Sequence, residues 1–460
     1  MDVLLDVIML PVGFSVLSVV CWFMAIRTDP QIRLPLGLYS GFYLATTVIG
    51  GVLIGCSRGE VLDTLQWGLD LTVICDCSSI RYWGLLFAPL IVPAMCIVVL
   101  HRFRLVEDVF VAPLRLFDER LSPLALCCVY AIFAGYCVVQ LSMHGLLFNV
   151  LLWFSLQGDY LTMILRRQEA FESLGSAFFG IAYITLPTLS FCALYQYRQL
   201  RTLSWQLRFF ATAASTLLIN MELMQKSPSL LFLTFTGIGS IELKTLKLRS
   251  LVYMLAGLVC GVTLLQALFI DQWAWWNSIQ LLIFRMASSF PFYVNIYPNV
   301  LPYSGIESGL HLVGLGEPAI DCFDVFNCMY PSVTWIQGAA PGPAHMRAYS
   351  QAGLPYALGT LVLIGFVIKG IGALRVRNAG PISFAIYLQS LAFLYYLTQT
   401  SLRESIISCY GIFWAIVGLI PIALTQTSQA KSATINRING RGTFRRASHR
   451  THSRGATVLD

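Results

Sequence analysis

Isolated positive charges are the feature of this sequence best suited to chemistry. Arg285 is the single charged residue in the stretch 272–304. Arg166 and Arg167 are adjacent in ILRRQEAFES, and Lys226 lies in MQKSP between two apolar runs. A cation in apolar surroundings has to be compensated, and a ligand anion is one way to do so. The helix expected to follow Lys226 adds the positive end of its dipole. Together these four cations predict a clamp for a diphosphate.

Each of these cations also has a structural interpretation, which the sequence leaves open. The amine of Lys226 can extend to the membrane interface, because the lysine side chain is long and flexible. Arg285 can form a structural ion pair instead of binding a ligand. Glu169 and Glu172 follow the paired arginines closely enough to offset their charge. Arg347 is a further candidate for the clamp.

His345 is the candidate general base, because imidazole can take a proton from a sugar hydroxyl near neutral pH. It lies in the Gly- and Pro-rich segment GAAPGPAHMRAYSQAGLPY, two residues before Arg347. A histidine on a loop surface is the alternative interpretation. Asp159 and Glu307 are weaker candidates for the same proton transfer.

Aromatic residues are concentrated between Asp271 and Gly353, where fourteen aromatic side chains accompany only seven charged ones. The segment WAWWNSIQLLIFRMASSFPFYV predicts an interfacial helix whose tryptophans anchor it at the headgroups. Four aromatic residues lie instead among Pro and Gly, where a substrate-facing role, against a sugar ring, is as well supported as anchoring. These are Tyr293, Tyr297, Tyr303 and Trp335.

The composition shows which elements must position these residues. The 460 residues are 57% hydrophobic and 12% charged, with a mean hydropathy of +0.71, whereas soluble chains carry about 25% charged residues. The charges are gathered in short clusters between apolar runs long enough to cross a bilayer, which needs about 20 residues each. The chain is therefore expected to be an all-α, polytopic integral membrane protein.

Eleven apolar stretches qualify as spans, and the odd number places the two termini on opposite sides. The N-terminal sequence MDVLLDVIML lacks a basic region, so the first stretch is expected to remain as a span. The stretches lie at about 7–26, 34–55, 82–100, 123–142, 175–196, 207–224, 227–242, 250–270, 354–374, 381–399 and 406–424.

The distribution of Lys and Arg predicts the orientation, because basic residues near span ends resist translocation. With the C-terminus in the cytoplasm, that side holds 22 of the 30 basic residues and the opposite side eight. The N-terminus is accordingly expected on the outer side and the C-terminus in the cytoplasm. Residues 1–424 form the transmembrane domain, with a large extracytoplasmic loop at 271–353, and residues 425–460 a basic, disordered cytoplasmic tail. Because most of the net charge of +7 lies in that tail, the basic balance predicts no nucleic-acid partner.

Five of the 13 cysteines fall on the expected outer side, where disulfides can form. Cys322 with Cys328, and Cys56 with Cys75 or Cys77, are candidate pairs. None of these spacings makes a convincing metal site, and no metal is predicted. A glycine-rich nucleotide loop, an HExxH motif and a GxSxG motif are also missing from the sequence, which removes the usual signatures of ATP-driven transport, zinc proteolysis and esterase chemistry.

The arrangement resembles the bacterial oligosaccharide repeat unit polymerases, the Wzy-type O-antigen and exopolysaccharide polymerases. The resemblance is carried by the Lys-Pro break at MQKSP and by the outer-loop segments FRMASSFPFYVNIYPNVLPYSGIESGLHLVGLG and FNCMYPSVTWIQGAAPGPAHMRAYSQAGL. It covers roughly residues 155–375 and extends to the number of spans. The Cys322/Cys328 pair and the long basic tail depart from the family pattern.

The resemblance implies a GT-C-like glycosyltransferase of the bacterial inner membrane that uses no cofactor. A glycan linked to undecaprenyl diphosphate would be transferred to a hydroxyl of a second lipid-linked repeat unit, with release of undecaprenyl diphosphate. Arg285, Arg166, Arg167 and Lys226, with Arg347 in addition, would stabilise the leaving diphosphate, and His345 would deprotonate the acceptor. The implied partners are the lipid-linked oligosaccharide, the bilayer, a chain-length regulator and a flippase.

Two other functions fit parts of the sequence. An O-antigen ligase would have a similar architecture, but it would transfer finished glycans to the lipid A core. A lipid-oligosaccharide flippase or ion-coupled permease would carry charges in the middle of its spans and short loops. Charges inside the spans are scarce here and an 83-residue loop dominates, which favours an enzyme over a transporter.

Overall fold

The computed structural model is all-helical over the residues that it describes: 5–65, 67–74, 77–101, 121–149, 151, 160–223, 226–241, 257, 260, 280, 283–306, 320–333, 338–376, 380–407 and 411–424. The principal helices are α2 (Leu10–Thr28), α3 (Arg33–Tyr43), α4 (Ile49–Cys56), α5 (Glu60–Thr64), α6 (Ile80–Leu100), α8 (Pro123–Met143), α10 (Tyr160–Ser173), α11 (Ser176–Gly180), α12 (Leu186–Leu200), α13 (Leu203–Glu222), α14 (Lys226–Ser240), α17 (Ser289–Ile296), α18 (Asp321–Met329), α19 (Ala344–Val376), α20 (Pro381–Tyr396) and α21 (Leu402–Ile406).

Six helical stretches in the described part of the chain are long and apolar enough to cross a membrane. They are Val7–Thr28, Pro30–Cys56, Ile80–Leu100, Pro123–Met143, Ser176–Leu200 and Ala344–Leu374. Helices α13, α14 and α20 and the short helix Phe413–Leu424 occupy four further predicted spans. The predicted span 250–270 lies almost entirely outside the described residues. The structure thus confirms a helical chain with several apolar helices, and the count of eleven spans stays a prediction.

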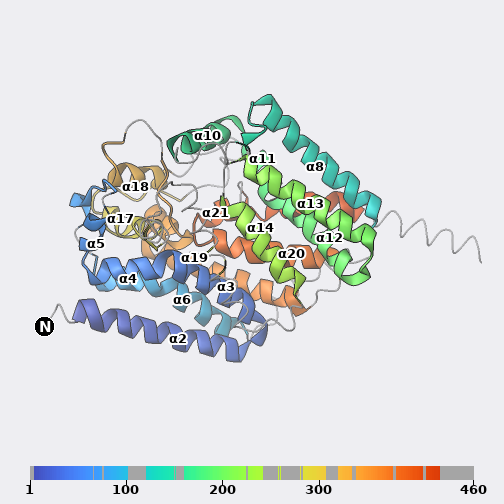
Figure 1. Cartoon of the computed structure of the whole chain (residues 1–460). Coiled ribbons are helices and arrows are strands. Elements are labelled where there is room, and N and C mark those ends of the chain that lie inside the picture. Colours follow the sequence, from blue (N-terminus) through green and yellow to red (C-terminus); the bar gives the residue numbers. More distant parts are fainter. Residues whose placement is uncertain are drawn as a thin grey trace, which may run out of the picture.

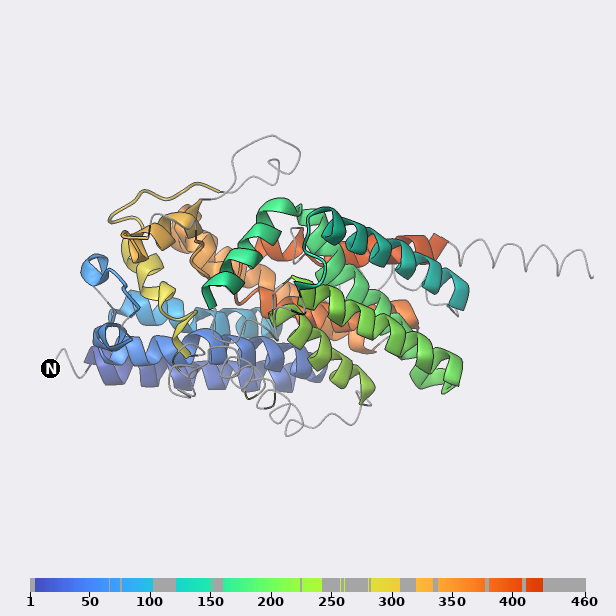
Figure 2. The same ribbon diagram turned by 45° about the horizontal axis from the view of Figure 1, so that its top comes forward.

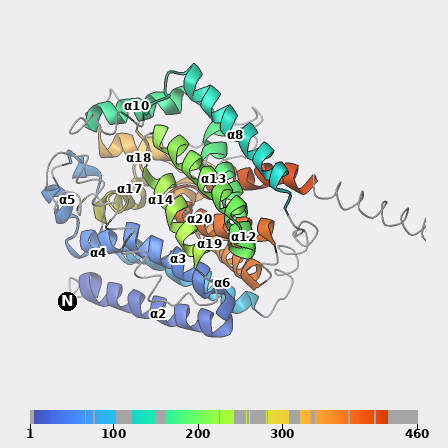
Figure 3. The same cartoon turned by 45° about the vertical axis from the view of Figure 1, so that its right-hand side comes forward.

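The helices form two groups on either side of α20. One group contains α2, α3, α4 and α6 together with α17, α18 and α19, and the other contains α8 and α11 to α14 (Figures 1, 2 and 3). Helix α20 packs against α3 and α19 of the first group and against α12 and α14 of the second. Almost all of its side chains are buried, so α20 is the central element of the fold.

The outermost helices present apolar side chains outward. On α2, Val12, Val16 and Phe23 are each more than half exposed, and on α8 the same holds for Leu124 and Ile132. Both helices are apolar on all sides, which is the pattern of a helix that contacts lipid on one face and protein on the other. These faces are where acyl chains would lie against the protein.

Local signals explain several boundaries. Helix α6 begins after Ser79, whose hydroxyl accepts a hydrogen bond from the Tyr82 amide, and α8 begins after Ser122 with Pro123 in its first turn. The span predicted at 354–374 is the second part of α19. Its start coincides with a break at Ala352 and Gly353, where Gly353 has a φ of 78° that L-residues rarely adopt.

Two expectations for the large loop are wrong. Cys322 and Cys328 are free thiols. They lie six residues apart on α18, which separates them by about 240° around the helix axis and about 9 Å along it. The predicted interfacial helix also fails where it can be compared, because every residue of α17 is buried. Cys56 is likewise a free thiol, so its predicted disulfide is not formed.

Candidate functional site

The candidate site lies around the residues that close α20, which we call the α20 end (residues 395–404). The chain turns back on itself there: the amides of Thr398 and Gln399 donate to the carbonyls of Tyr395 and Tyr396, each at 2.9 Å. Ser401 then opens α21 and forms a capping box with Glu404. This compact turn fixes several polar groups at one end of the central helix.

Segments from the large loop are fastened to the α20 end. The Gly342 amide donates to the Gln399 carbonyl at 3.3 Å, and the Ala344 amide donates to the Leu397 carbonyl at 3.1 Å. The Ser289 hydroxyl donates to the carbonyl of Pro341 at 2.5 Å. These bonds bring the beginnings of α17 and α19 to the same place as the end of α20.

Arg285 lies beside this turn with its side chain exposed. The backbone around it packs closely on α4, where a Cβ at Gly50 would lie 2.4 Å from the Ile283 carbonyl oxygen. The guanidinium is near enough to Tyr395 for the two side chains to interact electrostatically. No carboxylate pairs with Arg285 in the part of the chain that the structure describes. It is therefore a cation with room for an anionic ligand.

The beginning of α14 approaches the α20 end from the other group of helices. Lys226 is the first residue of α14, and Pro228, two residues later, lines a small pocket together with Tyr396 and Tyr183. Arg285 and the N-terminus of α14 thus both adjoin consecutive residues of α20, Tyr395 and Tyr396. The clamp that these cations were predicted to form stays a prediction.

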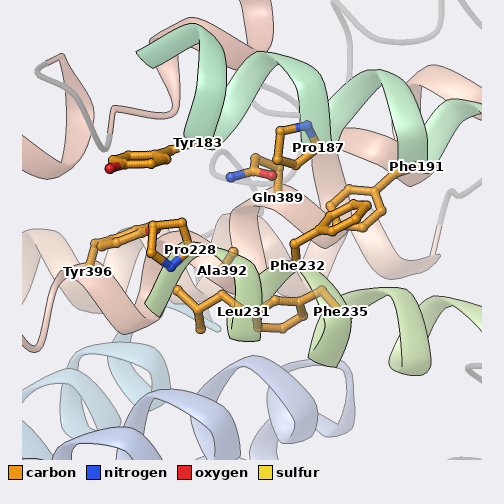
Figure 4. Close-up of a pocket in the computed structure, with 10 residues that line it drawn as sticks. All are labelled: Tyr183, Pro187, Phe191, Pro228, Leu231, Phe232, Phe235, Gln389, Ala392 and Tyr396. Carbon is orange, nitrogen blue, oxygen red and sulfur yellow. The ribbon is translucent and has the colours of Figure 1, made fainter. Parts of the chain in front are cut away.

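The pocket lies between α12, α14 and α20 (Figure 4). Tyr183, Pro228 and Tyr396 lie toward one end, and Phe191 and Phe235 toward the other. The free volume inside it is about 10 Å³, whereas sites for drug-sized ligands measure about 300–1,000 Å³. It therefore has room for about one water molecule and is not a ligand cavity as it stands. Its complete lining is Tyr183, Pro187, Phe191, Pro228, Leu231, Phe232, Phe235, Gln389, Ala392 and Tyr396.

Arg347 has two carboxylate partners. Its Nε lies 2.5 Å from Asp321 Oδ2 and its Nη2 lies 3.6 Å from Glu404 Oε1. The Ser350 hydroxyl also donates to Asp321 Oδ2, at 2.7 Å. The Arg347 side chain is only 4% exposed, so it connects α18, α19 and α21 and presents little of its charge to a ligand.

His345 is enclosed in a hydrophobic cluster. It is 1% exposed, its Nε2 lies 3.1 Å from the Leu85 carbonyl oxygen, and its ring meets those of Tyr43 and Phe290. A sugar hydroxyl cannot reach the imidazole in this arrangement. The predicted role of His345 as a base therefore has no support from its surroundings and stays a prediction.

The paired arginines lie on α10, a peripheral helix. Arg166 forms an ion pair with Glu169 at 2.8 Å, and both side chains are more than 40% exposed. Such exposed pairs contribute about 0–1 kcal/mol and break easily, so Arg166 keeps the capacity to bind an anion. The inclusion of Arg166 and Arg167 in the clamp stays a prediction.

The four predicted sugar-binding aromatics differ in accessibility. Tyr293 and Tyr297 are fully buried, and the Tyr293 hydroxyl donates to the Ala340 carbonyl at 3.1 Å. Tyr303 is 40% exposed and lies edge-on to Tyr349. Trp335 lies outside the described residues, as do Asp159 and Glu307. Of the described members, only Tyr303 offers a ring face to a ligand.

Three residues of this region were not predicted from the sequence as part of a site. Arg81 donates to the carbonyls of Val294 and Tyr297, at 2.8 and 2.5 Å, and so fastens the end of α17 to α6. Asp321 and Glu404 hold Arg347. The signal that could have identified Glu404 is the motif SLRES, in which Ser401 and Glu404 have capping-box spacing.

Comparison with models of protein families, with curated proteins and with solved structures finds no match for this chain.

Proposed function

We propose that this protein polymerises oligosaccharide repeat units linked to undecaprenyl diphosphate, by glycosyl transfer at one membrane surface. The observation that carries the proposal is Arg285, an exposed guanidinium with no carboxylate partner among the described residues, which interacts with Tyr395 at the α20 end. The N-terminal turn of α14 approaches the next residue of that helix, Tyr396. A helix N-terminus and a free guanidinium are both suited to a phosphate group. The resemblance to the Wzy-type polymerases names the substrate.

The chemistry follows from where charge develops. When the bond between the sugar anomeric carbon and the diphosphate oxygen breaks, the leaving diphosphate gains negative charge. Cations that are already in position stabilise that charge more in the transition state than in the ground state. Arg285 and the N-terminal turn of α14, with Lys226, would act in this way.

The proposed reaction takes place on the periplasmic side of the membrane. Arg285 and the α20 end would face the periplasm, with the N-terminus on the same side and residue 460 in the cytoplasm, in the inner membrane of a bacterium. The distribution of Lys and Arg supports this orientation, because 22 of 30 basic residues then lie in the cytoplasm.

The test uses the purified full-length protein in lipid vesicles with lipid-linked repeat units and no nucleotide or ion gradient. The wild type is expected to produce a ladder of glycan lengths on a gel. Arg285→Ala should leave only single repeat units. Arg208→Ala is the matched control, because it removes an arginine far from the α20 end. Arg208 lies fourteen residues before Glu222, the last residue of α13, which places it about 21 Å along the helix from the end that leads to α14.

The outcomes separate the proposal from its rivals. A wild-type protein that moves substrate across the vesicle membrane without lengthening it would be a flippase. A protein that lengthens no glycan, but transfers it to lipid A core when that acceptor is added to the vesicles, would be a ligase. Long chains made by Arg285→Ala at normal protein abundance would remove Arg285 from the mechanism.

A further inference from the structure

We infer that Glu404 is the base that takes the proton from the acceptor hydroxyl during glycosyl transfer. The inference rests on the proposed function and adds a catalytic residue to it. Glycosyl transfer to a hydroxyl needs a group that removes the hydroxyl proton as the new bond forms, and a carboxylate is a common choice. His345 is enclosed in the described arrangement, which favours an accessible side chain at the α20 end for this role.

Exposure distinguishes Glu404 from the charged groups around it. The side chain of Asp321 is 0% exposed and that of Arg347 is 4% exposed, whereas that of Glu404 is 33% exposed. These three side chains form a row that leads from the interior to the surface. Only its last member, Glu404, can meet a substrate.

The carboxylate of Glu404 is held in a defined orientation. Its Oε2 accepts a hydrogen bond from the Ser401 amide at 3.4 Å, while the Ser401 hydroxyl accepts one from the Glu404 amide at 3.2 Å. Its Oε1 lies 3.6 Å from Arg347 Nη2. Arg347 is itself fixed by Asp321 at the shorter distance of 2.5 Å. Arg347 is therefore a positioning residue, because it orients Glu404 while its own charge is shared with a buried partner.

Glu404 belongs to the same turn as the proposed diphosphate site. Tyr395, which interacts with Arg285, and Tyr396, which lies beside Pro228 in the pocket lining, precede it by nine and eight residues. The hydrogen-bonded turn between them keeps these residues together. The two acidic residues of α10 are instead engaged on an exposed helix surface, where Glu169 pairs with Arg166 and Glu172 accepts a hydrogen bond from Gln168. Glu404 is thus an accessible carboxylate on the turn that adjoins the proposed leaving-group site.

The acceptor hydroxyl gives its proton to a Glu404 carboxylate oxygen while the oxygen atom forms a bond to the anomeric carbon of the donor sugar. The bond from that carbon to the diphosphate oxygen breaks, and its electron pair leaves with the diphosphate. The proton on Glu404 then passes to solvent, which its exposure permits, and the carboxylate is restored. No oxidant, reductant or other reactant is required.

Three variants test this role in the vesicle assay. Glu404→Gln keeps an oxygen that can accept the hydrogen bond from the Ser401 amide, but its amide group cannot act as a base. This variant should lengthen glycans about 10²–10⁴-fold more slowly than the wild type. Glu404→Ala should be similarly slow and should regain part of its rate with added formate, which supplies a carboxylate in the vacated space. Ser401→Ala removes a hydroxyl from the capping box while keeping the carboxylate, and should retain most of the rate.

Binding of the lipid-linked repeat unit and the thermal midpoint in detergent are measured for each variant. The inference predicts both to stay close to wild type in Glu404→Gln. A wild-type rate in Glu404→Gln would overturn it, and so would a loss in Ser401→Ala as large as that in Glu404→Gln, because the cap would then explain both. Failure of formate to restore any rate to a folded Glu404→Ala would also count against it. A wild-type protein that makes no ladder defeats the proposed function instead.

Discussion

Lys369 and Asp29 form an ion pair in the interior of the protein, between α19 and the turn that joins α2 to α3. Both side chains are at most 5% exposed, although 340 residues separate them in the sequence. The other oxygen of Asp29 accepts a hydrogen bond from the Gln31 amide at 3.1 Å, which starts the short helix Pro30–Ile32. The pair therefore attaches the N-terminal helical hairpin to a helix from the C-terminal third of the chain.

Lys369→Met should destabilise the protein by about 3–5 kcal/mol, because it leaves the Asp29 carboxylate buried and uncompensated. The thermal midpoint in detergent measures the loss. The double variant with Asp29→Asn removes both charges and keeps an oxygen for the Gln31 amide, so it should recover most of the midpoint. A double variant as unstable as Lys369→Met would show that the charge pair is not the cause.

Gly180→Ala should destabilise the contact between α11 and the helix Phe413–Leu424. An added Cβ would lie 2.3 Å from the Trp414 ring, and overpacking of this kind costs about 1–3 kcal/mol. Gly135→Ala on α8 is the matched control, because a Cβ there meets nothing within 4 Å. The control should be neutral or slightly stabilising, since alanine favours helix by about 1 kcal/mol. Equal midpoints for the two variants would contradict the described packing.

Asn220→Leu should raise the thermal midpoint. Asn220 is 0% exposed and neither atom of its amide has a hydrogen-bond partner in the described chain, which costs about 1–3 kcal/mol. Thr216→Val, one turn earlier on α13, should lower the midpoint, because Thr216 Oγ1 lies 2.9 Å from the Tyr130 hydroxyl and 3.2 Å from the Ser190 hydroxyl. A destabilised Asn220→Leu would indicate that the amide has a bound partner in the membrane.

Helices with strong local signals are the part of the fold that could be predicted. The prediction 123–142 agrees with α8 at Pro123–Met143, because Ser122 and Pro123 mark its start and the apolar run marks its length. The start predicted at 354 agrees with the break at Gly353, because Gly353 and Pro355 are residues that commonly interrupt a helix. The short helix α18 was missed, since nine residues carry too little periodicity to distinguish a helix from a loop. Most of α17 was expected to be helical, but as the end of a longer interfacial helix and not as a buried one.

The site was predictable only where one residue is informative by itself. Arg285 could be selected because a single charge stands in a long uncharged stretch. The partners of Arg347 could not be found in this way, because Asp321 and Glu404 lie 26 and 57 residues away and nothing local links them. Without that knowledge Arg347 resembles a free cation, and His345, placed on a loop by its Gly- and Pro-rich surroundings, resembles an exposed imidazole.

The central place of α20 also sets the order in which the protein can be completed during synthesis. Its residues 381–396 leave the ribosome after both groups of helices that it joins. Until then α3 and α12 lack a partner for faces that end up buried, and the turn that carries Glu404 has not been made. Domains are generally assembled as their segments emerge. The nascent chain therefore inserts most of its helices first and acquires its candidate site close to the end of translation.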